Sequence, residues 1–139
     1  MVSDKALLID IVRFSDPRGN LSVLEPPGAL PFAPRRAYWI YDVPAGNYRD
    51  GHAYRRATEV IVALSGSFDI TVENEDGIRR FTLSRPDTGL LVPPLTWRCI
   101  DNFATNSVAL VVTDTLYDES DYIRDKELFD SLIANERDD

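Results

Sequence analysis

The sequence contains few of the residues that most often bind metals or form cross-links. Among its 139 residues there is one histidine, His52, and one cysteine, Cys99. A single chain therefore cannot build the histidine-rich zinc, iron or manganese sites that need two or three imidazoles. It also cannot form an intrachain disulfide, which suits a reducing compartment. We expect no metal ion and no cofactor, and a cytoplasmic location.

Basic residues and long apolar runs are also scarce. The 15 lysines and arginines are outnumbered by 23 aspartates and glutamates, which gives a net charge of −8. Nucleic acids and anionic membranes bind basic surfaces, so neither is expected as a partner. Residues 1–14 lack the apolar stretch and the small-residue cleavage site of a signal peptide. No run approaches the roughly 18 apolar residues of a membrane helix.

Most of the sequence consists of short apolar runs separated by turn residues. These runs are rich in Val, Ile, Thr, Tyr and Phe, which fit the pleated surface of a strand, and they predict an all-β sandwich or barrel. The length fits one domain, spanning residues 1–139. Strands are expected at residues 7–14, 21–24, 37–43, 59–65, 67–74, 78–83, 89–92, 96–100 and 107–113.

The pattern changes near the carboxyl end of the chain. From Glu119 onward the sequence is polar, with apolar pairs at 128–129 and 132–133, which is helical spacing. Ser120 is a suitable residue to cap the start of a helix. We therefore expect one C-terminal α-helix over about 119–135.

His52 is separated from Tyr54 by one residue. On a strand, that spacing places both side chains on the same face. If this face looks into a barrel, an imidazole and a phenol lie side by side there, with Arg49 and Arg56 flanking them in the sequence. Imidazole titrates near neutral pH and a phenol donates hydrogen bonds, so the pair is a candidate for acid/base chemistry.

The spacing around His52 resembles the first motif of the cupin superfamily. That motif is a glycine, five residues, His-x-His, three or four residues, a glutamate, six residues and a glycine. Gly46, His52, Glu59 and Gly66 stand at the corresponding positions, and Tyr54 replaces the second histidine.

The second cupin motif is also visible, with a shortened gap between Gly89 and Pro93. Arg98 stands where metal-binding cupins place their third histidine. A guanidinium stays protonated and does not coordinate metals, and the phenol of Tyr54 titrates near 10 in its ordinary state. The residues therefore argue against a metal at this site.

Within the cupins, the chain is similar to the nucleotide-sugar 3,4-ketoisomerases and their WxcM-like relatives, from about residue 8 to about residue 130. The resemblance implies an RmlC-like jelly-roll barrel with a C-terminal helix. It also implies metal-independent isomerisation of a dTDP-4-keto-6-deoxyhexose to its 3-keto isomer through an enediol, in deoxysugar biosynthesis, by a homodimer with exchanged β-strands. The matching segments are Asp16–Leu21, Arg36–Asp42, Arg49–Tyr54, Ala63–Ser67, Gly89–Pro94 with Trp97, and Tyr117–Arg124.

The resemblance further implies roles for individual residues. The acid/base histidines of the family map onto His52 and Tyr54, and Tyr38 matches an active-site tyrosine. The positions of Arg18 and Arg98 bind substrate and are associated with the configuration of the product at C4; this chain has arginine at both. The other candidates for binding the nucleotide-sugar are Arg36, Arg49, Trp97 and Asp101.

Tyr54 leaves three functions open. The first is the ketoisomerase with His52 as its main base. The second is a related isomerase or epimerase with a different outcome, because Tyr54 changes where the proton is returned. The third is a binding module that keeps the nucleotide-sugar pocket without turnover. Replacing His52 with Asn separates enzyme from binder, since an enzyme would lose turnover and keep its affinity for the ligand.

Overall fold

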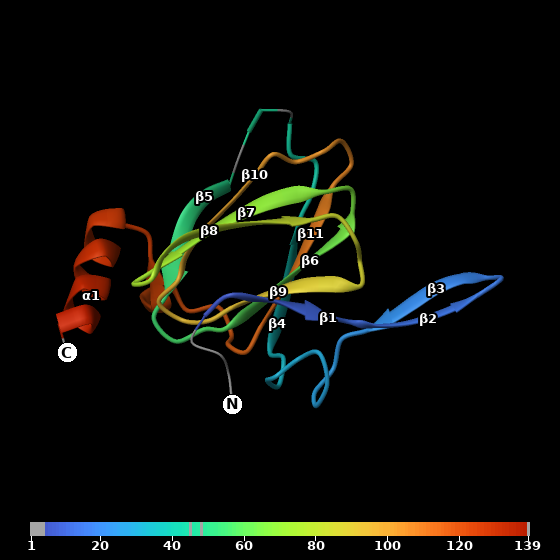
Figure 1. Ribbon diagram of the computed structural model, residues 1–139, viewed down its shortest axis with the longest axis horizontal. Helices are drawn as coiled ribbons and strands as arrows, with labels where there is room; N and C mark the ends of the chain where they lie inside the picture. Colours follow the sequence, from blue (N-terminus) through green and yellow to red (C-terminus); the bar gives the residue numbers. More distant parts are fainter. Residues whose placement is uncertain (1–4, 45, 48, 139) are drawn as a thin grey trace.

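The computed structural model describes residues 5–44, 46–47 and 49–138, with the backbone alone for residues 49–50 and 136–138. It is built mostly of β-strands and has one C-terminal α-helix (Figure 1). The expected all-β architecture with a single helix is therefore confirmed. In chain order the elements are β1 (Leu7–Asp10), β2 (Val12–Asp16), β3 (Gly19–Val23), β4 (Arg36–Ile40), β5 (Arg49–Tyr54), β6 (Glu59–Ser65), β7 (Phe68–Asn74), β8 (Gly77–Leu83), β9 (Thr88–Val92), β10 (Trp97–Asp101), β11 (Val108–Thr113), the 3-10 helix η1 (Glu119–Asp121), β12 (Tyr122–Ile123) and α1 (Lys126–Asp138).

Ten of the strands form two five-stranded sheets with antiparallel pairing. One sheet has the order β1-β9-β6-β11-β4, and the other has the order β12-β5-β10-β7-β8. The sheets face one another, and the main core of the protein fills the space between them. Strand alternation sends Ile61 of β6, Leu90 of β9 and Ile70 of β7 into this core, where each is fully buried.

A second apolar layer covers the outer face of the first sheet. Val60 and Val62, which alternate with the inward-facing residues of β6, pack there with the buried Leu30 from the segment that precedes β4. Because β6 is buried on both faces, its sequence reads as a continuous apolar run rather than as an alternating one. The predicted strand at 59–65 coincides with β6.

The C-terminal helix is shorter at its start than expected, because α1 begins at Lys126 rather than near residue 119. Residues 119–121 form the 3-10 helix η1, which Asp118 caps by accepting a hydrogen bond from the backbone N–H of Ser120. The next two residues then pair with β5 as β12, so the chain is extended before it becomes helical. Phe129 and Ile133 of α1 are buried against this second sheet.

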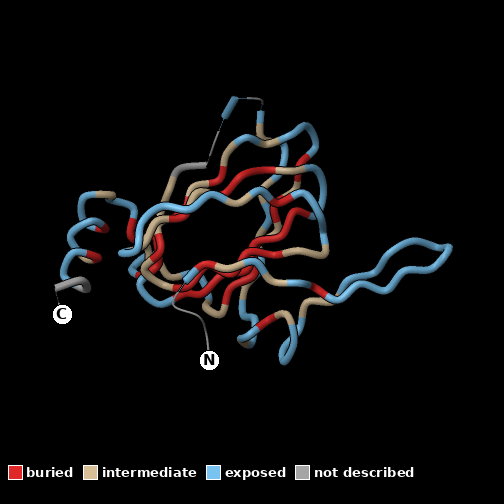
Figure 2. Tube along the Cα trace, viewed as in Figure 1, coloured by how far each residue is buried: buried red, intermediate tan, exposed pale blue. Residues whose placement is uncertain are grey.

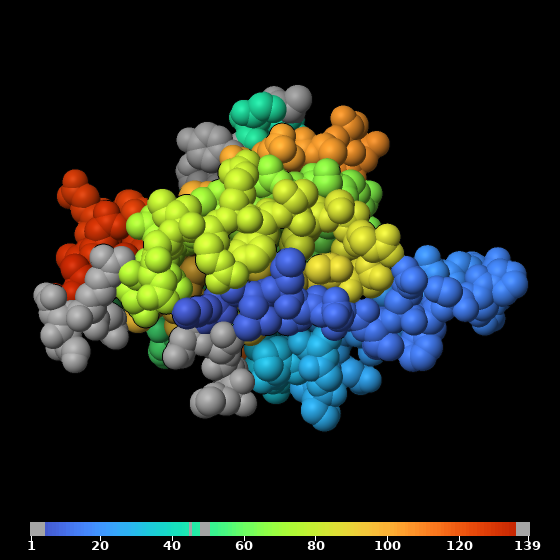
Figure 3. Space-filling view, viewed as in Figure 1, coloured from blue at the N-terminus to red at the C-terminus, as the bar shows by residue number. Residues whose placement is uncertain are grey.

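The hairpin formed by β2 and β3 projects from the rest of the molecule (Figures 1 and 3). The two strands pair only with each other, and nearly all of their residues are exposed (Figure 2). Three of these are large apolar residues, Val12, Phe14 and Leu21, each more than half exposed. An isolated two-stranded hairpin is marginally stable in water, so this segment lacks the packing that the other strands have.

Candidate active site

Strand alternation places His52 and Tyr54 on one face of β5, while Ala53 between them points to the opposite face and packs under α1. The rings of His52 and Tyr54 meet edge to face, with their centroids 5.0 Å apart and their planes at 79°. His52 pairs in register with Arg98 of the neighbouring strand β10. The imidazole and the phenol therefore lie side by side, as the spacing predicted.

Glu59, Arg98 and Tyr38 form a closed hydrogen-bonded network between the two sheets. Arg98 of the second sheet donates from Nε to Glu59 Oε1 at 3.0 Å and from Nη2 to Oε2 at 3.2 Å. Its Nη2 also donates to the hydroxyl of Tyr38 at 2.8 Å, and that hydroxyl donates to Glu59 Oε2 at 2.8 Å. Glu59 and Arg98 are only 0% and 2% exposed, so this ion pair is shielded from solvent.

The charges of this network stabilise each other. Burial works to raise the pKa of Glu59, but the neighbouring Arg98 and, to a smaller extent, His52 hold that pKa below its usual range. Burial works to lower the pKa of Arg98, and Glu59 keeps it above the ordinary value. Glu59 is therefore an ionised carboxylate whose two oxygens are already engaged, and it is poorly placed to act as a base.

The phenol of Tyr54 is in a different state. Burial, the charge of Glu59 and the nearby Tyr38 raise its pKa well above the ordinary value, so the group is neutral at physiological pH. Its hydroxyl is buried and makes no hydrogen bond of normal geometry to any described residue. A buried phenol in this state is a hydrogen-bond donor that is available to a ligand.

Tyr122 completes an aromatic cluster with this pair. It stands opposite Tyr54 in the β12–β5 pairing. Its ring centroid lies 4.7 Å from that of Tyr54 and 5.3 Å from that of His52. The guanidinium of Arg124 lies over the same ring, 4.2 Å from its centroid. The segment that follows β11 thus limits the freedom of both candidate catalytic side chains.

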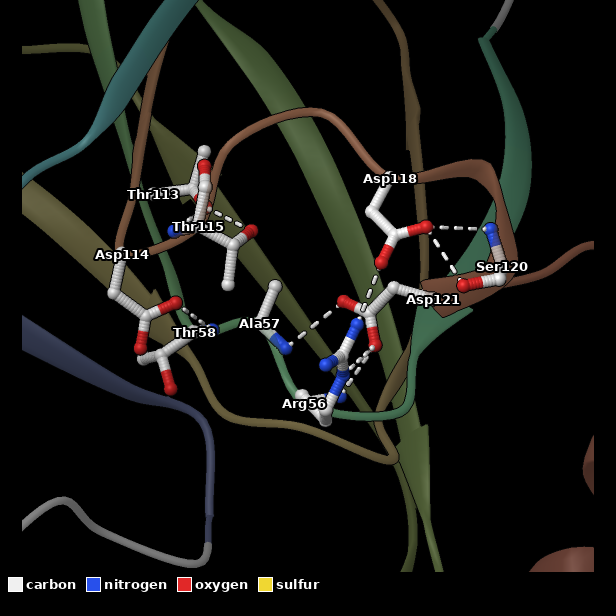
Figure 4. A network of polar contacts seen from close by, with 9 residues as sticks. All are labelled: Arg56, Ala57, Thr58, Thr113, Asp114, Thr115, Asp118, Ser120 and Asp121. Atoms are coloured by element: carbon white, nitrogen blue, oxygen red, sulfur yellow. Dashed lines mark hydrogen bonds and ion pairs between the residues drawn. The ribbon is translucent and has the colours of Figure 1, made fainter.

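Two carboxylates attach this segment to the chain that leaves β5 (Figure 4). Asp121 accepts hydrogen bonds from the backbone N–H groups of Arg56 at 2.8 Å and Ala57 at 3.2 Å, and from Arg56 Nε at 3.3 Å. Asp118 accepts from Arg56 Nη2 at 2.7 Å and from the backbone N–H and hydroxyl of Ser120. Asp121 is 3% exposed, so its loss would leave backbone donors without acceptors.

Arg36 lies on the same face of β4 as Tyr38. Its guanidinium carbon is 5.4 Å from the ring centroid of Tyr38 and 5.6 Å from that of Tyr117. Its Nε is buried and makes no hydrogen bond to a described residue. A guanidinium that lies between two rings and has an unused N–H donor is suited to an anionic ligand such as a phosphate.

Comparison with known proteins identifies the family. The family model described as FdtA (WxcM-like, C-terminal) matches residues 4–134. The chain belongs to this family. It is 33% identical over 127 residues to the TDP-4-oxo-6-deoxy-alpha-D-glucose-3,4-oxoisomerase of Aneurinibacillus thermoaerophilus, with 91% of each chain covered.

Solved structures of sugar 3,4-ketoisomerases match over almost the whole chain. QdtA, a sugar 3,4-ketoisomerase from Thermoanaerobacterium thermosaccharolyticum in complex with TDP, has a TM-score of 0.92 at 29% identity, covering 97% of this chain and 98% of that one. The WlaRB TDP-quinovose 3,4-ketoisomerase from Campylobacter jejuni has a TM-score of 0.86 at 31% identity, covering 91% and 98%. The expected cupin-like fold is thereby confirmed.

Five of the residues expected at the site of this FdtA-like chain lie together in the structure. They come from β4, β5 and β10, and all face the space between the sheets. Tyr38 and Arg98 are joined directly by a hydrogen bond, and His52 and Tyr54 touch through their rings. The five residues are Arg36, Tyr38, His52, Tyr54 and Arg98.

Trp97 and Asp101 are placed elsewhere. Both alternate with Arg98 on β10 and so point to the outer face of the second sheet. Trp97 packs on Phe129 of α1, with ring centroids 5.5 Å apart. It also crosses β5 so closely at Gly51 that any Cβ at that position would collide with the indole. Asp101 forms an ion pair with Arg80 at 3.2 Å. The prediction that these two residues bind substrate is not supported by their position.

Arg18 and Arg49 are not brought to the site by the described part of this chain. Arg18 lies at the turn of the projecting hairpin, where it forms an ion pair with Asp16 at 2.7 Å. The side chain of Arg49 is outside the described residues, although its backbone pairs with Ile100. Any role of Arg18 near His52 would have to be played in a second copy of the chain.

Sequence reasoning missed three residues of the site. Glu59 was a motif position, but nothing in the spacing showed that Arg98 would pair with it. Tyr122 lies in the matching segment Tyr117–Arg124, in which no residue was given a role, and its register opposite Tyr54 depends on an extended pair of residues with no clear signal. Tyr117 approaches Arg36 only in three dimensions.

The described residues contain no group of three or more His, Cys, Asp or Glu side chains that could hold a metal ion. At the cupin motif, both oxygens of Glu59 are occupied by Arg98 and Tyr38. The helices in the described part of the chain are too short or too polar to cross a membrane.

Proposed function

We propose that this chain isomerises a dTDP-4-keto-6-deoxyhexose to its 3-keto isomer by acid/base chemistry, without a metal or other cofactor. The observation that carries the proposal is the pairing of His52 with Tyr54 on the inward face of β5 in a member of the FdtA family. The curated relative is named for this reaction, and the QdtA structure holds TDP. A reducing, cytoplasmic location is consistent with the free thiol of Cys99.

The residues divide the chemistry between them. Moving the ketone from C4 to C3 requires removal of the C3 proton, formation of an enediol and delivery of a proton to C4. His52 is the natural base, because imidazole titrates near neutral pH. The neutral phenol of Tyr54 donates a hydrogen bond to the oxygen that gains charge as the enediol forms. Arg36 is positioned to bind phosphate or keto oxygens.

The network of Glu59, Arg98 and Tyr38 supports this chemistry indirectly. Arg98 donates its hydrogen bonds from Nε and Nη2 to Glu59 and Tyr38. It therefore acts on the ligand chiefly as a fixed positive charge. We infer that it anchors the facing sheets at the level of His52 and steadies the developing negative charge of the enediol.

A dimer with exchanged strands is part of this proposal. The projecting β2–β3 hairpin exposes Val12, Phe14 and Leu21, which is an unusual amount of apolar surface for two strands that pair only with each other. A second copy of the chain would cover it. In that arrangement the hairpin also carries Arg18 toward the partner, which would reconcile its predicted role with its distance from the site of its own chain.

The deciding experiment is proton NMR of the purified protein with dTDP-4-keto-6-deoxyglucose, in a buffer that contains a metal chelator. The expected result is a new 3-keto species, formed by the unaltered chain and not by His52→Asn. Broadened ligand signals without a new ketone would instead favour a binding module. Hydrogen exchange at C3 without a new ketone would show that the proton is removed but the transfer is not completed. Activity that appears only when a divalent metal is restored would contradict the metal-free chemistry.

A further inference from the structure

Glu119, in the 3-10 helix η1, accepts hydrogen bonds from two side chains that lead to different parts of the candidate site. Its Oε1 accepts from Arg124 Nε at 2.9 Å, and its Oε2 accepts from Arg124 Nη2 at 3.1 Å and from the hydroxyl of Tyr117. Two such bonds fix the plane of a guanidinium as well as its position. Glu119 and its two donors are here called the brace.

The Arg124 side of the brace leads to the acid/base pair. The guanidinium carbon of Arg124 lies 4.2 Å from the ring centroid of Tyr122. That ring packs on both His52 and Tyr54, with centroids 5.3 Å and 4.7 Å away. Glu119 thus holds the cation that covers the Tyr122 ring, and the ring in turn restricts the two side chains that are expected to do the chemistry.

The Tyr117 side of the brace leads to the candidate anion-binding residue. The ring centroid of Tyr117 lies 5.6 Å from the guanidinium carbon of Arg36, and the ring centroid of Tyr38 lies 5.4 Å from the same carbon. Tyr117 is 62% exposed, so packing restricts its ring only weakly. Its hydrogen bond to Glu119 therefore helps to keep the ring beside Arg36.

We propose that Glu119 is a positioning residue that serves both parts of the site. Through Arg124 it keeps the Tyr122 ring against the acid/base pair. Through Tyr117 it keeps Arg36 in place for an anionic group of the ligand. This inference rests on the proposed ketoisomerase function, and it adds three residues that act through others rather than on the ligand.

The brace is suited to this role because its charges persist and its side chains are exposed. The hydrogen bonds from Arg124 and Tyr117 lower the pKa of Glu119 to about 2, so the carboxylate stays ionised at neutral pH. The side chains of Arg124 and Glu119 are 56% and 58% exposed, and exposed ion pairs contribute little to stability. Loss of the brace should therefore leave the fold intact and change the affinity for the ligand and the rate of the reaction.

The test measures the two sides of the brace separately, by calorimetric titration with dTDP and by the single-turnover rate at saturating dTDP-4-keto-6-deoxyglucose. Tyr117→Phe keeps the ring and removes its bond to Glu119. We expect it to weaken dTDP binding about 3-fold, the scale of a cation–π contact, at an unchanged rate. Arg124→Gln should lower the rate about 10-fold with unchanged dTDP binding, because small displacements of a catalytic group are costly. Glu119→Gln should show both effects.

Asp130→Asn is the matched control. It removes the ion pair that a similarly exposed carboxylate, at 54%, makes with Lys126 on α1. This variant should change neither the dTDP affinity nor the rate. If Glu119→Gln fails to fold, Tyr117→Phe and Arg124→Gln decide the question on their own.

Three results would overturn the inference. Glu119→Gln could behave like the control, or Tyr117→Phe and Arg124→Gln could alter the same quantity. Weaker dTDP binding in Arg124→Gln would show that its guanidinium binds the ligand directly. An unaltered chain that converts no sugar would instead overturn the proposed function, while the dTDP titrations would still test the Tyr117 side of the brace.

Discussion

At the scale of single residues, Glu59 is the centre of the polar network in the protein interior. It is fully buried, and it accepts hydrogen bonds from side chains on both sheets, Arg98 on one and Tyr38 on the other. A buried ion pair contributes little net stability compared with a well-packed apolar pair, because both charges lose their hydration. Breaking such a pair is costly, however, because the remaining charge is left without compensation.

We therefore expect Glu59→Gln to destabilise the protein by about 3–5 kcal/mol, since Arg98 would remain charged and 2% exposed. The free energy of unfolding would be measured from urea transitions. Tyr38→Phe is the control, because it removes one hydroxyl, with its hydrogen bonds to Arg98 and Glu59, and leaves both charges paired; its cost should be about 2 kcal/mol, in the range of a hydrogen bond to a charged group. Equal losses in the two variants would show that the charge of Glu59 is not what the network depends on.

At the scale of elements, the segment from Asp114 to Arg124, here called the strap, is attached by hydrogen bonds to the chain that leaves β5. Asp114 accepts from the backbone N–H of Thr58 at 3.0 Å, and Asp121 accepts from the next residues toward β5. Between these attachments and α1, the strand β12 pairs with β5 and presents Tyr122 to His52. The carboxylates of the strap thus set the register of an aromatic ring that touches the candidate base.

We expect Asp121→Ala to lower kcat about 10-fold or more with little change in KM, because misplacing a catalytic group by about 1 Å can cost up to 10²-fold in rate. The assay would be run at a temperature where circular dichroism shows the variant to be folded. Ser120→Ala is the control, since it removes only an exposed hydroxyl bonded to Asp118. If folded Asp121→Ala keeps the full kcat, the strap has only a structural role.

The strength of local signals explains which elements the sequence predicts. The run at 59–65 is apolar on both faces and bounded by a tight corner at Gly66, so its limits coincide with β6. Strand β5 was not among the strands predicted from apolar runs, because Arg49, Asp50, Gly51 and His52 carry little apolar character. The start of α1 was placed too early, because a polar stretch with capping residues also suits the 3-10 helix that it forms.

The candidate site was predictable where it depends on the alternation of side chains between the two faces of a strand. The spacing of His52 and Tyr54 gives their shared face directly. The same alternation along β10 places Arg98 on the inward face and Trp97 and Asp101 on the outward face. All three were candidate ligands on the basis of the sequence. Contacts between sheets, such as the pair of Arg98 with Glu59, depend on how the sheets stack, and no spacing within one strand encodes that.

The projecting hairpin matters at the scale of the whole molecule. Both sheets bury their apolar faces within one chain, whereas β2 and β3 contribute almost nothing to the core (Figure 2). Phe14 and Leu21, paired across the hairpin, stay 59% exposed. A symmetric dimer in which each hairpin packs on the other copy would bury them and place Arg18 against the partner.

This arrangement makes a prediction for mixtures of two inactive variants. His52→Asn removes the base, and Arg18→Ala removes the guanidinium that the hairpin carries. If the hairpin completes the partner's site, a dimer of one variant with the other has one site with both residues intact and one with neither. A 1:1 mixture that is unfolded and refolded together forms such mixed dimers as half of its population. It should therefore recover about a quarter of the wild-type activity, by the counting that twofold symmetry imposes.

The control is the same mixture combined without unfolding, in which the subunits do not exchange and activity should stay at the level of the single variants. If Arg18 acts within its own chain, every site in the mixed dimer lacks one of the two residues, and refolding restores nothing. Arg18→Ala with full activity would show that this arginine is not part of any site. Recovery near a quarter would place the hairpin in the partner's active site and make the isolated chain half of each functional unit.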